Sequence, residues 1–99
     1  MSKIDLILMR EFSILLIMKK TKLFHKILYG SKNIRFDEAV QFAEMFGFHL
    51  DRVSGSHHIY KHQDIPELIN LQNVNGKAKP YQIRQLLKII ERHNLHMEV

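Results

Sequence analysis

Three segments of the chain place apolar residues at the three- and four-residue spacing that forms one face of a helix. The first covers residues 20–29, and Gly30 can supply its left-handed C-terminal stop. The second follows Asp37, which we predict to be its N-cap, and ends at Gly47. The third begins at Pro80, a residue that the first turn of a helix tolerates. Four apolar residues are predicted to form its buried face: Ile83, Leu86, Leu87 and Ile90.

Between the second and third helices, apolar residues alternate with polar ones, as they do in half-buried strands. The alternation begins at Phe48, and the Ser-Gly-Ser sequence at 54–56 predicts a turn after it. A second strand is predicted at about 57–62 and a third at 68–74, closed by the Asn-Gly pair at 75–76. We therefore expect an α+β two-layer fold, a three-stranded antiparallel sheet covered by helices on one face.

The composition favours one small soluble domain. A chain of 99 residues with 45% apolar content is long enough for one modest core. It contains no cysteine, which removes disulfides, thiolate nucleophiles and cysteine-based zinc sites. The apolar run 12–18 is far shorter than the roughly twenty residues of a membrane span. We expect a cytoplasmic protein without a membrane partner, in which 18–99 form a single domain and 1–17 are an upstream extension from start-codon choice.

The formal net charge of +5 is unevenly distributed along the chain. Residues 1–35 contain eight basic and two acidic residues, whereas residues 36–75 contain two basic and six acidic residues. Residues 76–99 contain five basic and two acidic residues. Basic flanks of this kind suit a polyanion, and they are equally typical of a solvated surface.

Two histidines follow a Gly-Ser turn in the segment 55–60, Gly-Ser-His-His-Ile-Tyr. Histidine both accepts and donates a proton near neutral pH, so a turn that presents one at the start of a strand suits a general acid/base. The alternative is that His57 and His58 are polar residues on a solvated strand face. A histidine without a metal favours RNA over DNA, because the RNA 2′-hydroxyl is an internal nucleophile.

The spacing of the histidines argues against a metal site. His57 and His58 point to opposite faces of a strand, and His58 and His62 lie roughly 13 Å apart on one. Nothing resembles the strained elbow of a serine nucleophile, and the glycines do not fit a phosphate-binding loop. We therefore expect no metal and no other cofactor.

Four segments of the chain resemble the HicA family of toxins from type II toxin–antitoxin systems. They are 34–48, from Ile-Arg-Phe-Asp to Gly-Phe; 55–60; Asn-Leu-Gln at 70–72; and Gly-Lys-Ala-Lys-Pro-Tyr-Gln-Ile-Arg at 76–84. The resemblance covers about residues 20–95, and this chain adds an N-terminal helical segment to it.

The resemblance implies a fold related to double-stranded-RNA-binding domains and an endoribonuclease that cleaves mRNA. It also implies an antitoxin partner of the HicB type. One histidine after the turn formed by Gly55 and Ser56 is the implied catalyst. His57 occupies that position, and His58 stays open because some relatives place the histidine one residue later.

These observations leave three hypotheses. The leading one is a metal-independent endoribonuclease toxin with His57 as acid or base, neutralised by its antitoxin. Basic residues would bind the RNA phosphates: Lys61, Lys77, Lys79 and Arg84. The second hypothesis is a non-catalytic module of the same fold that binds RNA or the antitoxin. The third is a metal-dependent nuclease that uses Asp51, Asp64 and His57.

Overall fold

The computed structural model describes residues 2–98 of the chain. Its helices and strands follow the order α1 (Lys3–Tyr29), the short 3₁₀ helix η1 (Ser31–Asn33), α2 (Phe36–Met45), β1 (His49–Ser54), β2 (His57–Lys61), β3 (Ile69–Val74), β4 (Lys77–Ala78) and α3 (Pro80–Arg92).

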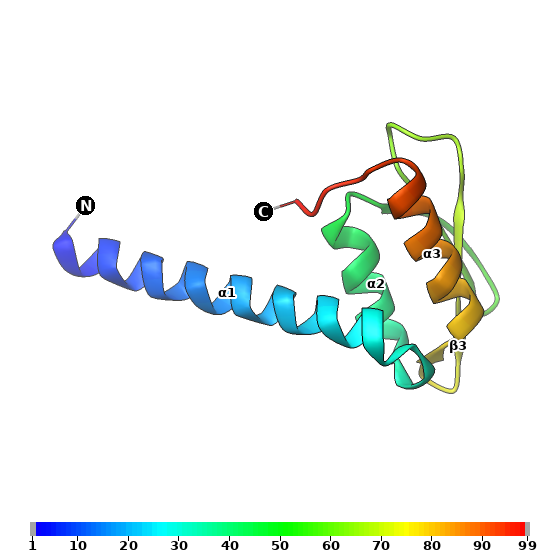
Figure 1. Cartoon of the computed structure of the whole chain (residues 1–99), viewed down its shortest axis with the longest axis horizontal. Coiled ribbons are helices and arrows are strands. Elements are labelled where there is room, and N and C mark those ends of the chain that lie inside the picture. The colour runs from blue at the N-terminus through cyan, green and yellow to red at the C-terminus, as the bar shows by residue number, and fades with distance from the viewer. Residues whose placement is uncertain (1, 99) are drawn as a thin grey trace.

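The strands form one antiparallel sheet in the order β1-β2-β3-β4, and α2 and α3 both pack on β3. α1 packs on α2 through its C-terminal part, and its N-terminal part extends away from the other elements as a long arm (Figure 1). The predicted α+β two-layer fold is confirmed, with four strands instead of three.

The fourth strand arises from the Asn-Gly pair that was predicted only to end the third. Asn75 and Gly76 have φ angles of 52° and 83°. Two positive φ angles in a two-residue loop define a type I′ hairpin turn, for which Asn-Gly is the preferred sequence. The chain therefore folds back at once, and Val74 pairs with Lys77 in β4.

The start of α2 differs from the prediction, because Arg35 and not Asp37 is its N-cap. The side chain of Glu38 turns back and accepts a hydrogen bond from the Arg35 backbone N–H at 3.0 Å. Asp37 lies in the first turn, where its carboxylate pairs with the Arg35 side chain at 3.1 Å. An acidic residue three positions into the helix thus performs the capping that was assigned to Asp37.

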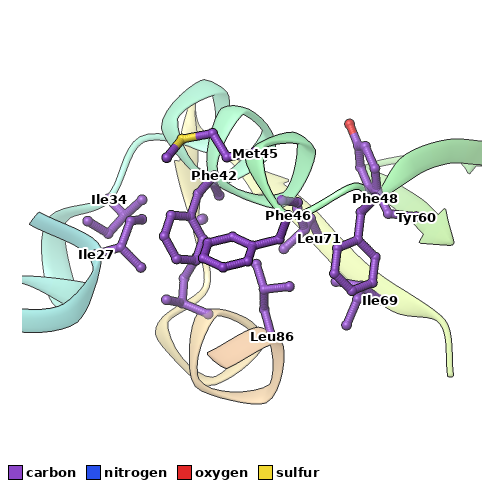
Figure 2. Close-up of a cluster of buried hydrophobic side chains, with 14 residues drawn as sticks. Ile27, Ile34, Phe42, Met45, Phe46, Phe48, Tyr60, Ile69, Leu71 and Leu86 are labelled. Atoms are coloured by element: carbon purple, nitrogen blue, oxygen red, sulfur yellow. The ribbon is translucent and has the colours of Figure 1, made fainter. Parts of the chain in front are cut away.

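The core lies between the sheet and the helices. Both layers contribute buried apolar side chains to it: Phe42 from α2, Phe46 at the C-cap of α2, Leu86 from α3, and Ile69 and Leu71 from β3 (Figure 2). The predicted apolar face of α3 is confirmed in its centre, because Ile83 and Leu86 are fully buried.

β1 is not the half-buried strand that its alternation predicted. All six of its residues are exposed, and Leu50 and Val53 each expose about half of their surface. β1 is an edge strand that pairs only with β2, whereas α2 and α3 pack on β3. The helical layer is therefore too narrow to cover β1.

Candidate catalytic face of the sheet

The hairpin between β1 and β2 presents the histidine pair. Ser54 pairs with His57, so Gly55 and Ser56 form a two-residue loop. Gly55 has a φ angle of +59°, and Ser56 is not among the residues with positive φ. This pattern is typical of a type II′ turn, which favours glycine at its first loop position. The sequence prediction of a turn here is confirmed, and the turn places His57 as the first residue of β2.

The pairing register decides which way each histidine points. Tyr60 of β2 is 4% exposed and pairs with Ile69, so both face the helices (Figure 2). Side chains alternate along a strand, so His58 lies on this covered face and His57 on the opposite, open face. The prediction that His57 and His58 point to opposite faces is confirmed.

On the open face, His57 contacts Asn70 of β3. The Asn70 Nδ2 atom lies 2.9 Å from His57 Nδ1, and Asn70 Oδ1 lies 3.2 Å from it. An asparagine amide offers a donor and an acceptor, so it can hold either tautomer of the ring. Within residues 2–98, His57 Nε2 has no hydrogen-bond partner. Asn70 therefore holds the ring and leaves Nε2 available to a substrate.

His58 is placed for packing. Its ring lies 4.6 Å from the ring of Phe36, measured between centroids, and is half-buried. Its Nδ1–H donates to the backbone carbonyl of Ser56, with Nδ1 and O 3.0 Å apart. These contacts stabilise the start of α2 against the hairpin, and they keep His58 away from the face that contains His57.

Two of the predicted phosphate-binding lysines share the open face with His57. Lys77 pairs with Val74 on the face opposite the buried Ala78, and alternation places Lys79 on that same side. The register of β3 and β4, continued by one residue, sets Lys79 across from Gln72, which pairs with His57. Two strand spacings, roughly 10 Å, therefore separate the backbones of Lys79 and His57.

Lys61 also points to the open face, but a carboxylate is bound to it. Its Nζ lies 3.2 Å from Asp51, which also pairs with Arg52 at 2.6 Å. Hydrogen bonds from Lys61, which has the larger effect, and from Arg52 hold the pKa of Asp51 below its usual value. Asp51 is therefore an anion that offsets much of the local positive charge, and Lys61 is less available to a phosphate than Lys77 or Lys79.

Arg84 is exposed on α3, in the layer on the other side of the sheet, so it does not join His57. Asp64 and Asp51 do not come together with His57 either. Within residues 2–98, no group of three histidine or carboxylate side chains is arranged to hold a metal ion.

The contact between His57 and Asn70 was not predicted from the sequence. It joins residues thirteen positions apart, and only the β2–β3 register reveals it.

Comparison with known protein families identifies the family of this chain. The family model described as HicA toxin of bacterial toxin–antitoxin systems matches residues 36–91. This span contains α2, the sheet and most of α3, and therefore includes the open face with His57 and leaves out α1. No curated protein matches the chain. Because the match covers more than half of the sequence, the chain belongs to the HicA family of toxins of bacterial toxin–antitoxin systems.

Proposed function

We propose that this toxin is an endoribonuclease that cleaves mRNA in the cytoplasm by metal-independent acid/base catalysis at His57. The observation that carries the proposal is the position of His57 on the open face of the sheet. Asn70 contacts its Nδ1, and among residues 2–98 nothing is hydrogen-bonded to its Nε2, which can therefore meet a substrate. A general acid/base needs this combination of a fixed ring and an accessible nitrogen.

RNA supplies the nucleophile for this chemistry. His57 Nε2 would take the proton of the 2′-hydroxyl, whose oxygen then attacks the adjacent phosphorus. The bond from phosphorus to the 5′-oxygen breaks, and that oxygen receives a proton as it leaves. The products would be a 2′,3′-cyclic phosphate or 3′-phosphate and a 5′-hydroxyl. A positioned histidine contributes roughly 10²–10⁴-fold to proton transfers of this kind.

Lys77 and Lys79 supply the positive charge for the RNA backbone. Both lie on the open face, close to the position of His57 in the sheet register. Within residues 2–98, neither lysine forms a salt bridge. Lysine ammonium groups neutralise phosphates without reading the base sequence. An antitoxin of the HicB type would neutralise the toxin by covering this same face.

The experiment compares the wild-type chain with His57→Ala and His58→Ala. Each protein is expressed in cells and purified, and growth arrest and RNA cleavage are measured, the latter in the presence of EDTA. We expect His57→Ala to lose growth arrest and to slow cleavage by at least 100-fold, a loss within the range for a positioned acid/base. His58→Ala should keep activity within a few-fold, since His58 contacts Phe36 and the hairpin backbone.

His49→Ala is the matched control, because His49 is an exposed histidine of the edge strand β1. Equal cleavage by His57→Ala and wild type would refute the catalytic role. Loss of activity in His58→Ala alone would assign the role to His58, and loss in EDTA would point to a metal-dependent nuclease. RNA binding without cleavage by the wild-type chain would establish the non-catalytic module instead.

A further inference from the structure

The segment 19–35, which joins α1 to α2, contains six basic residues and no acidic residue. The basic residues are Lys19, Lys20, Lys22, Lys26, Lys32 and Arg35. The segment lies outside the family match at residues 36–91. It includes the C-terminal part of α1, and among residues 2–98 no helix has both the length and the apolar content to cross a membrane. Lysines and arginines gathered on one surface are typical of proteins that bind nucleic acid.

Three of these lysines line a groove between α1 and the start of α2. Lys19, Lys22 and Lys26 are spaced by three and four positions, so their side chains project from the same side of the helix. Together with Arg35 they line a cavity of about 300 Å³. Within residues 2–98, neither Lys19 nor Lys22 forms a salt bridge. Like charges at this spacing repel, so an anion in the groove is attracted by several cations at once.

The acidic residue that lines this groove, Glu38, is neutralised by Lys26. Its carboxylate accepts hydrogen bonds of 2.8 and 2.9 Å from Lys26 Nζ, and its side chain is only 12% exposed. Arg35 pairs with Asp37 at 3.1 Å, but these two side chains are 64% and 62% exposed. An exposed pair of this kind is weak, so a phosphate can replace Asp37. Lys19, Lys22 and Arg35 are therefore the cations available to a ligand.

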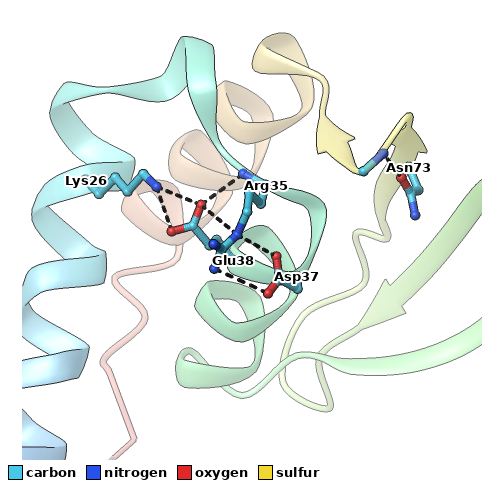
Figure 3. Close-up of polar contacts among 6 residues, drawn as sticks. Lys26, Arg35, Asp37, Glu38 and Asn73 are labelled. Carbon is cyan, nitrogen blue, oxygen red and sulfur yellow. Dashed lines mark hydrogen bonds and ion pairs between the residues drawn. The ribbon is translucent and has the colours of Figure 1, made fainter.

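Arg35 connects the groove with the open face of the sheet. Its backbone forms an antiparallel bridge with Lys77 of β4, flanked by hydrogen bonds of 2.8 and 3.0 Å. Directly paired residues of antiparallel strands point to the same side. The neighbouring Ile34 and Ala78 are buried, so Arg35 and Lys77 both project away from the core. Figure 3 shows Arg35 between α1 and the hairpin of β3 and β4. The positive charge of the open face therefore continues around the edge of the sheet into the groove.

We propose that this groove is a second binding surface for the RNA backbone, continuous with Lys77 and Lys79 on the open face. Three strand spacings, roughly 14 Å, separate the backbones of His57 and Arg35 across the sheet. The seven residues from Lys19 to Lys26 add roughly 10 Å along α1. An RNA at His57 is thus held on one side over several nucleotides. The inference rests on the proposed function for the place where the RNA is cut, whereas binding to the groove is measured without cleavage.

The shape of the surface favours RNA over a lipid membrane. A membrane surface is flat, whereas Lys19, Lys22 and Arg35 line a concave groove that continues to Lys77 around the edge of the sheet. A single strand can follow such a path, as strands do in the charged grooves of other binding proteins. Lysines contact phosphates without reading bases, so the groove should add affinity without adding sequence preference.

Fluorescence anisotropy with 2′-O-methyl RNA tests the proposal, because this RNA lacks the 2′-hydroxyl that would cut it. An RNA of about 16 nucleotides reaches from the open face into the groove, and one of about 4 covers the open face alone. We expect the double variant Lys19→Gln/Lys22→Gln to bind the long RNA about 10-fold more weakly and the short RNA as tightly as wild type. The slope of log K against log salt concentration for the long RNA should fall by about 1.4.

The double variant Arg84→Gln/Lys88→Gln is the matched control, because both residues are exposed on α3 and the same charge is removed. It should leave the affinity for both RNAs unchanged. Asp37→Asn should act in the opposite direction and tighten binding of the long RNA, because it releases Arg35. Circular dichroism and the unfolding transition verify that each variant stays folded.

Equal binding of the long RNA by Lys19→Gln/Lys22→Gln and wild type would overturn the proposal. So would an equal loss in the control on α3, which would reveal a general effect of net charge, or an equal loss for the short RNA. Loss of binding to phosphatidylglycerol vesicles or to a HicB-type antitoxin, with RNA binding unchanged, would assign the groove to that partner instead. Because none of these measurements involves cleavage, an inactive chain that binds RNA through the groove would overturn the proposed function alone.

Discussion

Replacement of Glu38 by glutamine tests how α1 is held against α2. Figure 3 shows the Glu38 carboxylate between Lys26 of α1 and Arg35 at the start of α2. It accepts hydrogen bonds from Lys26 Nζ at 2.8 and 2.9 Å and from the Arg35 backbone N–H at 3.0 Å. Only 12% of the Glu38 side chain is exposed, so water cannot fully replace these partners.

The magnitude follows from the three contacts. Lys26 is 44% exposed, so its pair with Glu38 is worth about 1 kcal/mol after solvent screening. The capping hydrogen bond to Arg35 adds about 1 kcal/mol. Glu38→Ala loses both and should cost about 2 kcal/mol, whereas Glu38→Gln keeps an oxygen for the cap and should cost about 1 kcal/mol. In a chain of this size, each kcal/mol lowers the melting temperature by about 4–8 °C.

The effect of Glu38→Gln should depend on pH. Burial alone would raise the pKa of Glu38, but hydrogen bonds from Lys26 and Arg35 outweigh it and lower that pKa below the usual value. The unfolded chain therefore binds the Glu38 proton more tightly than the folded chain does. The stabilisation is fully present above the usual carboxyl pKa, about 4.3, and is lost as the pH falls toward the lower folded value.

Urea denaturation at pH 7 and at about pH 3 provides the assay, with Glu38→Gln compared with wild type in both. Asp37→Asn is the control, because its pair with Arg35 is exposed and should contribute less than about 0.5 kcal/mol. Glu38→Gln should also cost less in a Lys26→Met background, by about 1 kcal/mol. Equal destabilisation at both pH values, or no coupling with Lys26, would show that the ionised Glu38 carboxylate does not stabilise the contact between α1 and α2.

Three further predictions concern the open face and its support. Asn70→Ala should lower kcat for RNA cleavage by roughly 10–100-fold with little change in KM, because Asn70 contacts the ring that we propose as the catalyst. Asn70→Asp should restore part of the lost kcat. Lys77→Gln and Lys79→Gln should each weaken RNA binding, measured by fluorescence anisotropy. Each should reduce the slope of log K against log salt concentration by about one, whereas Lys61→Gln should change it less. Gln82→Leu should cost about 1–3 kcal/mol in urea denaturation, because its side chain accepts a 2.7 Å hydrogen bond from the backbone of β3.

Each of these predictions has a contradicting result. An unchanged kcat in Asn70→Ala would remove its positioning role, and a change confined to KM would make it a binding residue. Lysine variants that leave the salt dependence unchanged would move the RNA to another surface. If the Gln82→Leu chain were as stable as wild type, the backbone N–H of Gln72 in β3 would be hydrogen-bonded to water in the variant.

The order of helices and strands could be predicted because apolar spacing and turn residues act locally. Pro80, Gly47 and the two Gly-containing turns each mark a boundary of an element that the structure confirms. β4 was missed although Asn75-Gly76 predicts a hairpin, because two residues are too few to show an alternation. The exposure of β1 was missed because an apolar alternation does not reveal whether a helix lies above it.

The candidate site was harder to predict because it depends on register. The sequence could place His57 and His58 on opposite faces, but it could not show which face the helices cover. The burial of Tyr60 decides that question, and it makes the face of His57 the open one. The pairing of Asp51 with Lys61 likewise depends on which residues the β1–β2 hairpin brings together. The sequence could not show this pairing, so Lys61 was predicted to contact phosphate as readily as Lys77 and Lys79.

We propose that His57 catalyses attack of the RNA 2′-hydroxyl without a metal ion. The most direct measurement is the cleavage rate of the purified toxin, in EDTA, on a short RNA and on the same RNA with one 2′-deoxy nucleotide at the cleaved position. Wild type should cleave only the all-ribose substrate and leave a 2′,3′-cyclic or 3′-phosphate, and His57→Ala should reduce that rate by at least 100-fold. Cleavage of the deoxy substrate would exclude attack by the 2′-hydroxyl, and equal rates for wild type and His57→Ala would exclude His57 as the catalyst.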